Sequence, residues 1–207
     1  MKVNEIFFSV EGEGKRSGQL AAFVRLTGCN LRCFYCDTEY AFHEGREMTC
    51  REIADAVKDY HNVTLTGGEP LLQNCHELLT LLRSHDVNIE TNGSIALAEY
   101  LKYTNVFFTM DFKCYSSGTS DAMNYSNLKI LRGKDVLKFV VGDEEDLELA
   151  REICREFNPK SEIYISPVFG KIETSSIVDF MKLRQMENWH LQVQLHKIIW
   201  SPDKRGV

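Results

Sequence analysis

Three closely spaced cysteines are the residues of this chain that most directly indicate chemistry. Cys29, Cys33 and Cys36 form the pattern Cys-x3-Cys-x2-Cys. A structural zinc site usually takes four protein ligands, so three thiolates do not complete one. Three thiolates can instead bind three irons of a cubane iron–sulfur cluster and leave the fourth iron open. An open iron indicates a cluster that acts on a bound molecule rather than one that only stores an electron.

The composition limits the class of protein. The chain has 207 residues, of which 43% are hydrophobic and 26% charged, and this fits a single globular domain over residues 1–207. The formal net charge is −6, and phosphate binding favours a basic face, so we expect no nucleic-acid partner. We find neither the apolar run of a signal peptide nor a stretch of about 20 apolar residues that could span a membrane. We therefore expect a cytoplasmic protein with no membrane partner.

The other cysteines suggest buried thiols. The chain has seven cysteines in all, and the four outside the motif are scattered. In a chain of this size without a secretion signal, cysteines indicate metal or catalytic ligands and buried thiols rather than a disulfide framework. We expect Cys50, Cys75 and Cys154 to pack as small hydrophobes. Cys114 follows a strand end, and its role stays open.

The elements that must position the motif follow from the apolar patterning. An apolar lead over residues 5–10 is followed by strands expected at residues 21–26, 63–66, 87–91, 106–111, 136–141, 163–166 and 189–195. Helices are expected from Thr49 to about residue 60 and at residues 71–82, 97–103, 143–157 and 174–186. Thr49 and Glu52 form a capping box for the first helix. Residues 115–127 read as a loop, followed by a helical turn at 128–131.

The alternation of strands and helices predicts the architecture. It favours an α/β fold with a mostly parallel sheet and right-handed crossovers. With six or seven strands, a partial barrel and an open sheet both fit. Ligands bind at the carboxyl ends of such strands. Polar or glycine-rich residues follow five of the strands, namely the cysteine loop, Gly67-Gly68-Glu69, Asn92-Gly93, Asp111-Phe112-Lys113 and Ser166-Pro167. Their convergence on one rim predicts the position of the site.

Two further stretches have more than one interpretation. Glu11-Gly12-Glu13-Gly14 fits a hairpin turn with exposed acids, and it also fits a glycine loop that lets the backbone approach a ligand. Arg25 lies inside an apolar run. It is either an edge residue with a buried stem or a guanidinium fork directed at a carboxylate ligand.

The motif resembles the signature of the radical S-adenosylmethionine enzymes. A second segment of that superfamily, Gly67-Gly68-Glu69-Pro70, follows the next strand. The resemblance implies that Cys29, Cys33 and Cys36 bind a 4Fe-4S cluster whose open iron is chelated by S-adenosylmethionine. The glycine backbone and the Glu69 carboxylate would hold the ammonium of that cofactor. Tyr35 would lie near its adenine.

Within the superfamily, the whole chain is similar to the family of 7-carboxy-7-deazaguanine synthases. The matching stretches are Ser9-Val10-Glu11-Gly12-Glu13-Gly14, Phe23-Val24-Arg25-Leu26-Thr27-Gly28-Cys29, Cys36-Asp37-Thr38, Thr66-Gly67-Gly68-Glu69-Pro70, Glu90-Thr91-Asn92-Gly93 and Gln194-Leu195-His196-Lys197. The resemblance implies a partial (β/α)6-type barrel with a mostly parallel sheet and reduced helix content. It also implies a lyase of queuosine and other deazapurine pathways.

The reaction implied by the resemblance starts from a pterin. A 5′-deoxyadenosyl radical would remove a hydrogen atom from C6 of 6-carboxy-5,6,7,8-tetrahydropterin. Ring contraction with loss of ammonia would then give 7-carboxy-7-deazaguanine, and Mg²⁺ would support the rearrangement. The implied partners are an electron donor such as flavodoxin or ferredoxin and a second copy of the chain in a homodimer.

The resemblance also implies roles for individual residues. The substrate contacts would be Val10, Glu11, Gly12, Glu13, Arg25, Thr66, Thr91 and His196. The lining of the cofactor site would be Tyr35, Gly67, Gly68, Glu69, Asp111, Phe112, Lys113, Ser166, Pro167, Val168 and Phe169. Of the Ser-Pro-Lys segment that is frequent in the family, only Lys113 is present here.

The metal ligand and one substrate contact have structural alternatives. The Thr38 hydroxyl would bind Mg²⁺, which keeps few protein ligands, and its alternative is a hydrogen bond within the loop. His196 would contact substrate, and its alternative is a structural hydrogen bond at a strand end.

Two other functions share the cysteine spacing. One is an activating enzyme that forms a glycyl radical on a protein partner, but Arg25 and the Ser9–Gly14 stretch favour a small carboxylated substrate. The other is a non-catalytic iron–sulfur protein, which would not need Gly67-Gly68-Glu69-Pro70.

Overall fold

The computed structural model describes residues 1–202 and 204–207. Within them the chain forms a nine-stranded sheet in the order β3-β1-β2-β4-β5-β6-β7-β8-β9. The strands are β1 (Lys2–Val10), β2 (Leu20–Leu26), β3 (Arg46–Glu47), β4 (Asn62–Gly67), β5 (Asp86–Thr91), β6 (Val106–Lys113), β7 (Val136–Val141), β8 (Glu162–Pro167) and β9 (Trp189–Leu191). The helices are α1 (Cys50–Val57), α2 (His76–Leu81), α3 (Glu144–Phe157), α4 (Thr174–Leu183) and α5 (Leu195–Ile199).

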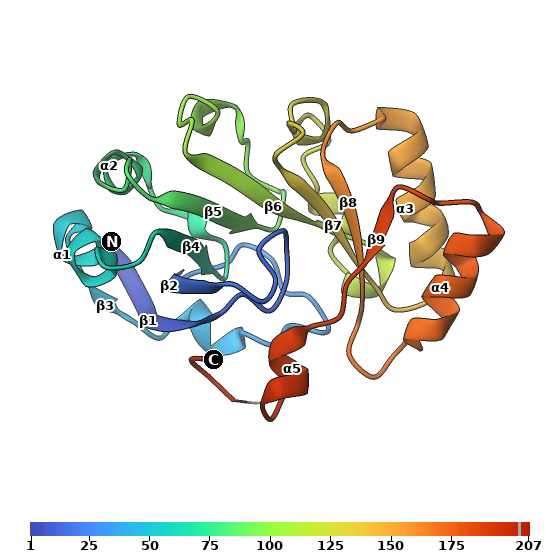
Figure 1. Cartoon of the computed structure of the whole chain (residues 1–207), viewed down its shortest axis with the longest axis horizontal. Coiled ribbons are helices and arrows are strands. Elements are labelled where there is room, and N and C mark those ends of the chain that lie inside the picture. Colours follow the sequence, from blue (N-terminus) through green and yellow to red (C-terminus); the bar gives the residue numbers. More distant parts are fainter. Residues whose placement is uncertain (203) are drawn as a thin grey trace.

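The sheet confirms the predicted fold class. From β2 through β9 the neighbouring strands are parallel, while β1 and β3 are antiparallel at one edge. The strands β3 and β9 lie at opposite ends of the order, so the sheet does not close into a barrel. In Figure 1 the strands fan out, α1 to α4 lie around the outside, and α5 with the C-terminus lies on the other side. No helix of the described residues is long and apolar enough to cross a bilayer.

The two faces of the parallel strands differ because strand side chains alternate. Val63 and Leu65 of β4 and Val87 and Ile89 of β5 are fully buried in the core on the helix side. The residues that follow them, Thr66 and Glu90, point to the other face and line a cavity there. In β6 and β7 the same alternation places Phe108, Met110, Phe112, Leu137, Phe139 and Val141 in the core.

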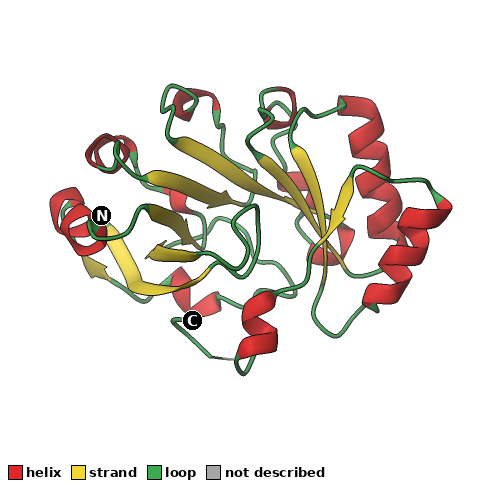
Figure 2. Cartoon of the chain, in the orientation of Figure 1, coloured by secondary structure: helices red, strands yellow, loops and turns green. Residues whose placement is uncertain are grey.

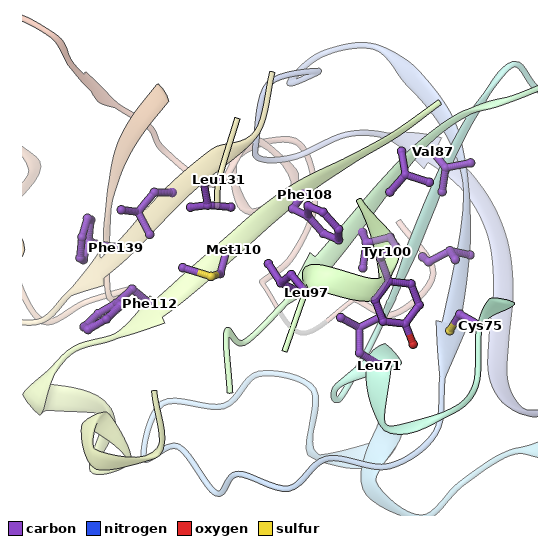
Figure 3. Packing of buried hydrophobic residues seen from close by; sticks show 14 of the residues in the cluster. Leu71, Cys75, Val87, Leu97, Tyr100, Phe108, Met110, Phe112, Leu131 and Phe139 are labelled. Atoms are coloured by element: carbon purple, nitrogen blue, oxygen red, sulfur yellow. The ribbon is translucent and has the colours of Figure 1, made fainter. Parts of the chain in front are cut away.

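Short helical segments cover much of the core face, which confirms the expected low helix content (Figure 2). The capping box of Thr49 and Glu52 is present at the start of α1. In the two connections from β5 to β6 and from β6 to β7 the helical segments are 3-10 turns, and Leu97, Tyr100 and Leu131 pack from these connections onto the sheet (Figure 3). The amide of buried Asn127 bonds Gly93 O, Ile95 O and Leu97 N. These bonds replace the internal hydrogen bonds that a helix would have supplied.

Two predicted helices are shorter in the structure. The helix expected at residues 71–82 is a 3-10 turn, Pro70–Leu72, followed by α2. Gln73 separates them because its side chain bonds Lys2 N, Lys2 O and Thr27 O, which fixes its backbone in an extended conformation. The helix expected at residues 97–103 is only the 3-10 turn Ala98–Tyr100.

The strand predicted at residues 189–195 ends early. β9 stops at Leu191, and the chain then turns into α5. The side chain of Gln192 accepts from Gly14 N at 2.7 Å and donates to Gly14 O at 3.0 Å. These bonds hold the glycine loop after β1 against the last strand.

A buried ion pair fixes the other end of the same loop. Arg16 is 6% exposed and Glu11 is 1% exposed. Arg16 donates to Glu11 at 2.8 Å and to Thr64 at 2.8 Å, and Thr64 also bonds Glu11. The backbone of Glu11 pairs with Gln19 and Gly18. Glu11 therefore anchors the loop rather than facing solvent.

Arg16→Met should be strongly destabilising, because it leaves the Glu11 carboxylate buried without its cation. Breaking a buried pair from one side costs about 3–5 kcal/mol. The free energy of unfolding, measured by denaturant titration, should fall by that amount.

The double variant Arg16→Met/Glu11→Gln should recover most of the loss, since it removes both charges. Lys15→Met serves as the matched control, because the pair of Lys15 with Glu162 is partly exposed and is worth at most about 1 kcal/mol. Equal losses in Arg16→Met and Lys15→Met would contradict this role for Arg16.

Candidate functional site

A cavity of about 810 Å³ lies at the carboxyl ends of the strands, as predicted. It is bounded by the cysteine loop, the loop after β1, α5 and the last residues of the chain. The predicted site residues that line it are Val10, Gly12, Glu13, Arg25, Cys29, Cys33, Tyr35, Cys36, Thr38, Thr66, Gly67, Gly68, Thr91, Asp111, Lys113, Pro167, Val168, Phe169 and His196. The cavity therefore brings together the cysteines and most of the polar strand ends.

The cysteine loop presents three free thiols to this cavity. Cys29, Cys33 and Cys36 are partly exposed and form no disulfide. Leu31 N donates a hydrogen bond to Cys29 Sγ at 3.4 Å. Burial raises the pKa of Cys29 and of Cys36, so without metal these thiols are protonated and must lose a proton when they bind iron.

A glycine of the next strand end packs directly on this loop. A Cβ on Gly68 would lie 2.6 Å from Cys29 Cβ and would also collide with the Gly28 carbonyl. Glu69 N donates to the same Gly28 carbonyl at 2.8 Å. The backbone of Gly67-Gly68 thus borders the thiols with no side chain between them. A ligand bound to iron could be contacted there by backbone groups.

The donor set fits a cluster better than a single ion. Across residues 1–202 and 204–207, no group of three or more His, Cys, Asp or Glu side chains is arranged to hold one metal ion. The three thiols nevertheless lie on one loop and face one cavity. A 4Fe-4S cluster takes one thiolate per iron, so its ligands need not converge on one point. The residues present therefore fit the predicted cluster.

Four of the predicted site residues do not line the cavity. The first, Glu69, is fully buried. Its carboxylate accepts from Leu71 N, Thr91 Oγ1 and Asn92 N, at 3.0, 3.0 and 2.6 Å. Here the carboxylate ties the end of β4 to the end of β5, and its contact with a cofactor ammonium stays a prediction. That role holds Gly68 in place.

The other three lie behind the cavity wall. Glu11 is engaged by Arg16, and its contact with substrate stays a prediction. Phe112 is 1% exposed and packs on Phe139 and Tyr125 in the core, because it lies on the apolar face of β6. Ser166 is fully buried at the end of β8, and its hydroxyl has no partner within the described residues.

Arg25 is held in a defined orientation. Its Nε donates to Glu5 Oε1 at 2.8 Å, and Tyr40 OH donates to the same oxygen at 3.0 Å. The guanidinium also lies near the rings of Phe7 and Tyr40. Because only Nε is engaged among the described contacts, the outer nitrogens remain available to a ligand in the cavity.

His196 closes the cavity from α5. Its ring lies against Gly12, where any Cβ would overlap the imidazole, and Leu195 N donates to Gly12 O at 3.0 Å. Burial lowers the pKa of His196, so the imidazole is neutral near pH 7. Gly12 is thus required for close approach of α5 to the loop after β1.

Thr38 lies at the mouth of the cysteine loop. Its hydroxyl donates to Asp37 Oδ1 at 2.8 Å, and Lys197 donates to Asp37 Oδ2 at 3.1 Å. The hydroxyl oxygen of Thr38 keeps its acceptor lone pairs and faces the cavity. The alternative considered from the sequence was a hydrogen bond to the loop backbone, whereas this hydroxyl bonds a side chain.

The cavity floor carries a row of charges of alternating sign, and only some of these residues were predicted from the sequence. Lys113 bonds Asp111 at 2.9 Å, and Lys138 lies 3.7 Å from Asp111 and 3.0 Å from Glu13. Lys138 was not predicted as a site residue, nor was Glu90. The pleat of β5 and β7 could have found both, since each follows a core residue on the opposite face.

Glu90 is the remaining carboxyl of this floor. Burial first, and then the nearby Glu11 carboxylate, raise its pKa from the ordinary 4.5 to about 7 against the opposing effects of Lys138 and Thr66. The folded protein therefore holds the Glu90 proton about as readily as it releases it at neutral pH.

The cysteine loop, the glycine segment and the parallel sheet together define a radical S-adenosylmethionine protein. The model of the Radical SAM superfamily matches residues 23–141, which is more than half of the chain. The solved structure of QueE from Escherichia coli shares the fold, with a TM-score of 0.77 at 22% identity over 93% of each chain. The chain belongs to the 7-carboxy-7-deazaguanine synthase family.

The family membership rests on close relatives. A 7-carboxy-7-deazaguanine synthase of Clostridium acetobutylicum is 50% identical over all of this chain and 99% of its own. Relatives of the same name from Methanospirillum hungatei and Koribacter versatilis are 38% and 37% identical. The alignment with the Methanospirillum hungatei relative covers 98% of this chain and 86% of that relative. The alignment with the Koribacter versatilis relative covers both chains completely.

Glu90→Gln should make the stability less sensitive to pH. In the folded protein the carboxyl is neutral up to about pH 7, whereas in the unfolded chain it ionises near 4.5. Ionisation therefore favours the unfolded state as the pH rises through this window. Relative to pH 5, the variant should gain about 2 kcal/mol over the wild type at pH 8.

Denaturant titrations at the two pH values measure this difference. Glu99→Gln is the matched control, because the Glu99 side chain is 81% exposed. If Glu90→Gln and wild type lose stability in parallel above pH 5, the raised pKa of Glu90 is contradicted.

Proposed function

We propose that this enzyme converts 6-carboxy-5,6,7,8-tetrahydropterin into 7-carboxy-7-deazaguanine with loss of ammonia. The main support is a single cavity. Three free thiols line one part of it, and carboxylates, ammonium groups and an oriented arginine line its floor. Relatives of up to 50% identity bear the name of that activity. When bound, the 4Fe-4S cluster and S-adenosylmethionine supply a carbon radical able to remove the hydrogen at C6 of the substrate.

The cofactor side of the cavity adjoins the thiols. Backbone groups of Gly67 and Gly68 would hold the amino acid end of S-adenosylmethionine, since they border Cys29 without side chains. Asp111 has one buried oxygen without a partner among the described residues, and it can accept from a cofactor hydroxyl or amine. Tyr35, Lys113 and the segment Pro167-Val168-Phe169 would form the remaining wall.

The substrate side lies across the floor from that wall. Arg25 would direct its free nitrogens at the substrate carboxylate. Glu13 Oε1 is buried without a partner among the described residues and would accept from a ring N–H. The neutral His196 would close over the ring from α5. Smaller residues of the cavity lining would make the remaining substrate contacts, namely Val10, Gly12, Thr66 and Thr91.

Mg²⁺ would bind at the edge of the cysteine loop. The Thr38 hydroxyl is the protein ligand we assign to it, and the other ligands would be substrate oxygens and water. The Asp37 carboxylate, fixed by Lys197, orients that hydroxyl. The protein would thus place the metal next to the group that starts the reaction.

The proposal also includes an electron donor, a cytoplasmic location and an oligomeric state. Phe34, between two of the cysteines, is 84% exposed, so an electron donor such as flavodoxin or ferredoxin could approach the cluster there. All seven cysteines are free, which fits a reducing cytoplasm. We expect a homodimer.

The proposed function predicts a defined product. Protein reconstituted with iron and sulfide without oxygen, then given reductant, S-adenosylmethionine, Mg²⁺ and the tetrahydropterin, should release 7-carboxy-7-deazaguanine and ammonia in equal amounts. Liquid chromatography with mass detection and an ammonia assay measure both. Absence of the deazaguanine with and without Mg²⁺, while S-adenosylmethionine is still cleaved, would favour a different substrate.

Thr38→Ala should separate the two functions of the cysteine loop. We expect an unchanged cluster absorbance and unchanged cofactor cleavage, because the thiols are untouched. Deazaguanine formation should fall about tenfold or more, since the metal loses its protein ligand. Thr38→Ser keeps the hydroxyl and should retain activity. Loss of the cluster in Thr38→Ala would overturn this division of roles.

A further inference from the structure

The middle cysteine of the motif, Cys33, has its sulfur beside a hydroxyl from a distant part of the chain. Thr119 Oγ1, 86 residues later in the sequence, lies 3.4 Å from Cys33 Sγ. The sulfurs of Cys29 and Cys36 accept instead from backbone N–H groups of the cysteine loop itself. The amide of Asn92 also approaches Cys29 Sγ, but at the longer distance of 3.9 Å. Thr119 is therefore a side chain whose contact with a cluster ligand can be removed without changing the cysteine loop.

The loop after β6 holds Thr119 against the cysteine loop. Phe34 N donates to Ser117 O at 3.0 Å, so the backbones of the two loops are bonded beside Cys33. A Cβ on Gly118 would lie only 2.5 Å from the Phe34 ring, so this close approach requires glycine. Thr119 itself is half-buried and lies outside the residues that line the cavity. A substitution at Thr119 therefore leaves the lining of the cofactor and substrate sites unchanged.

The hydroxyl of Thr119 has one proton and two acceptors within reach. Besides Cys33 Sγ, Ser117 Oγ lies 3.1 Å from Thr119 Oγ1. The Ser117 hydroxyl donates its own proton to Cys114 O at 2.6 Å and accepts from Thr119 N at 3.1 Å. Ser117 therefore has no proton left for Thr119 and can only accept from it. The proton of Thr119 is directed either at Ser117 Oγ or at Cys33 Sγ.

The state of the Cys33 sulfur decides between these two acceptors. A thiol can donate its S–H to Thr119, whose own proton then goes to Ser117. A cysteine that binds iron has lost its proton, so its sulfur can only accept. A negative sulfur also accepts more strongly than a neutral hydroxyl, because hydrogen bonds to ionised groups are the stronger ones. Thr119 therefore donates to Cys33 once iron is bound, and rotation of its hydroxyl is the only movement required.

We propose that Thr119 raises the reduction potential of the cluster by donating a hydrogen bond to Cys33 Sγ. Reduction transfers one electron from an external one-electron donor to the cluster, with no bond formed or broken, and makes the ligating sulfurs more negative. A hydrogen bond to sulfur therefore stabilises the reduced state more than the oxidised state. Thr119 acts through Cys33 and is not a ligand. The assignment depends on the cluster that the family implies and is independent of the substrate.

The test is a redox titration of the cluster-loaded protein without S-adenosylmethionine, so that no turnover occurs. Dithionite is added with mediators in the absence of oxygen, and electron paramagnetic resonance measures the reduced fraction. Thr119→Val replaces the hydroxyl with a methyl group and should bind the same amount of iron and sulfide as the wild type. Its equilibrium constant for one-electron reduction should be about tenfold lower, which is about 59 mV. Thr119→Ser keeps the hydroxyl and should stay within about twofold of the wild type.

Hydrogen exchange provides a second readout. Pulsed resonance spectra of the reduced cluster in water and in deuterium oxide detect exchangeable protons close to the sulfurs. Thr119→Val should lose one such coupling that the wild type and Thr119→Ser retain. Ser116→Ala is the control in the same turn, because the Ser116 hydroxyl bonds Asp143 and no cysteine. Thr104→Val is the control for the type of substitution, because Thr104 is exposed before the start of β6. Both controls should leave the potential and the couplings unchanged.

Each contrary outcome overturns the assignment. If Thr119→Val keeps the wild-type potential with a full cluster, the hydroxyl has no effect on reduction. If Thr119→Ser or Ser116→Ala lowers the potential as much as Thr119→Val does, packing of the turn rather than the hydroxyl is the cause. If Thr119→Val binds no cluster, Thr119 serves cluster assembly instead. A product assay without deazaguanine would overturn the proposed function alone, because the potential is measured without substrate.

Discussion

The pleat of the parallel strands is the constraint on which the rest of this structure depends. Successive side chains point to opposite faces, so each strand that buries Val, Ile, Leu or Phe against the helices must present its other residues to the cavity. β4 to β7 use that second face for Thr66, Glu90, Asp111 and Lys138. The register between parallel strands then sets the spacing of these groups across the floor. Core packing and the arrangement of the site are thus two results of one pattern.

Backbone contacts join the cluster loop to this sheet. The carbonyl of Gly28 and the Cβ of Cys29 leave no room for a side chain at Gly68, and the buried Glu69 carboxylate ties the same segment to the end of β5. The position of the thiols is therefore fixed relative to the strand ends. A cluster held by these thiols, and the cofactor bound to it, would therefore have a fixed position relative to Arg25 and Glu13.

The fold class and most of the site could be predicted, because strand order and strand ends follow from local apolar patterns and from the cysteine motif. What failed depends on contacts between distant residues. Glu69 and Glu11 are typical acidic ligands by residue type, and only the folded chain shows that each also has buried structural partners. Lys138 was passed over because its strand reads as continuously apolar. The break at Gln73 depends on bonds to β1 that no local pattern shows.

The bonds between Gly14 and Gln192 join residues 178 positions apart in the chain. As a ribosome delivers the protein from its N-terminus, the cysteine loop and the first four parallel strands emerge well before Gln192 does. The wall formed by the glycine loop and α5 can assemble only at the end of synthesis. Until Gln192 emerges, the cysteine loop therefore lies beside strand ends that lack this wall. The cavity is thus one of the last parts of the molecule to be completed.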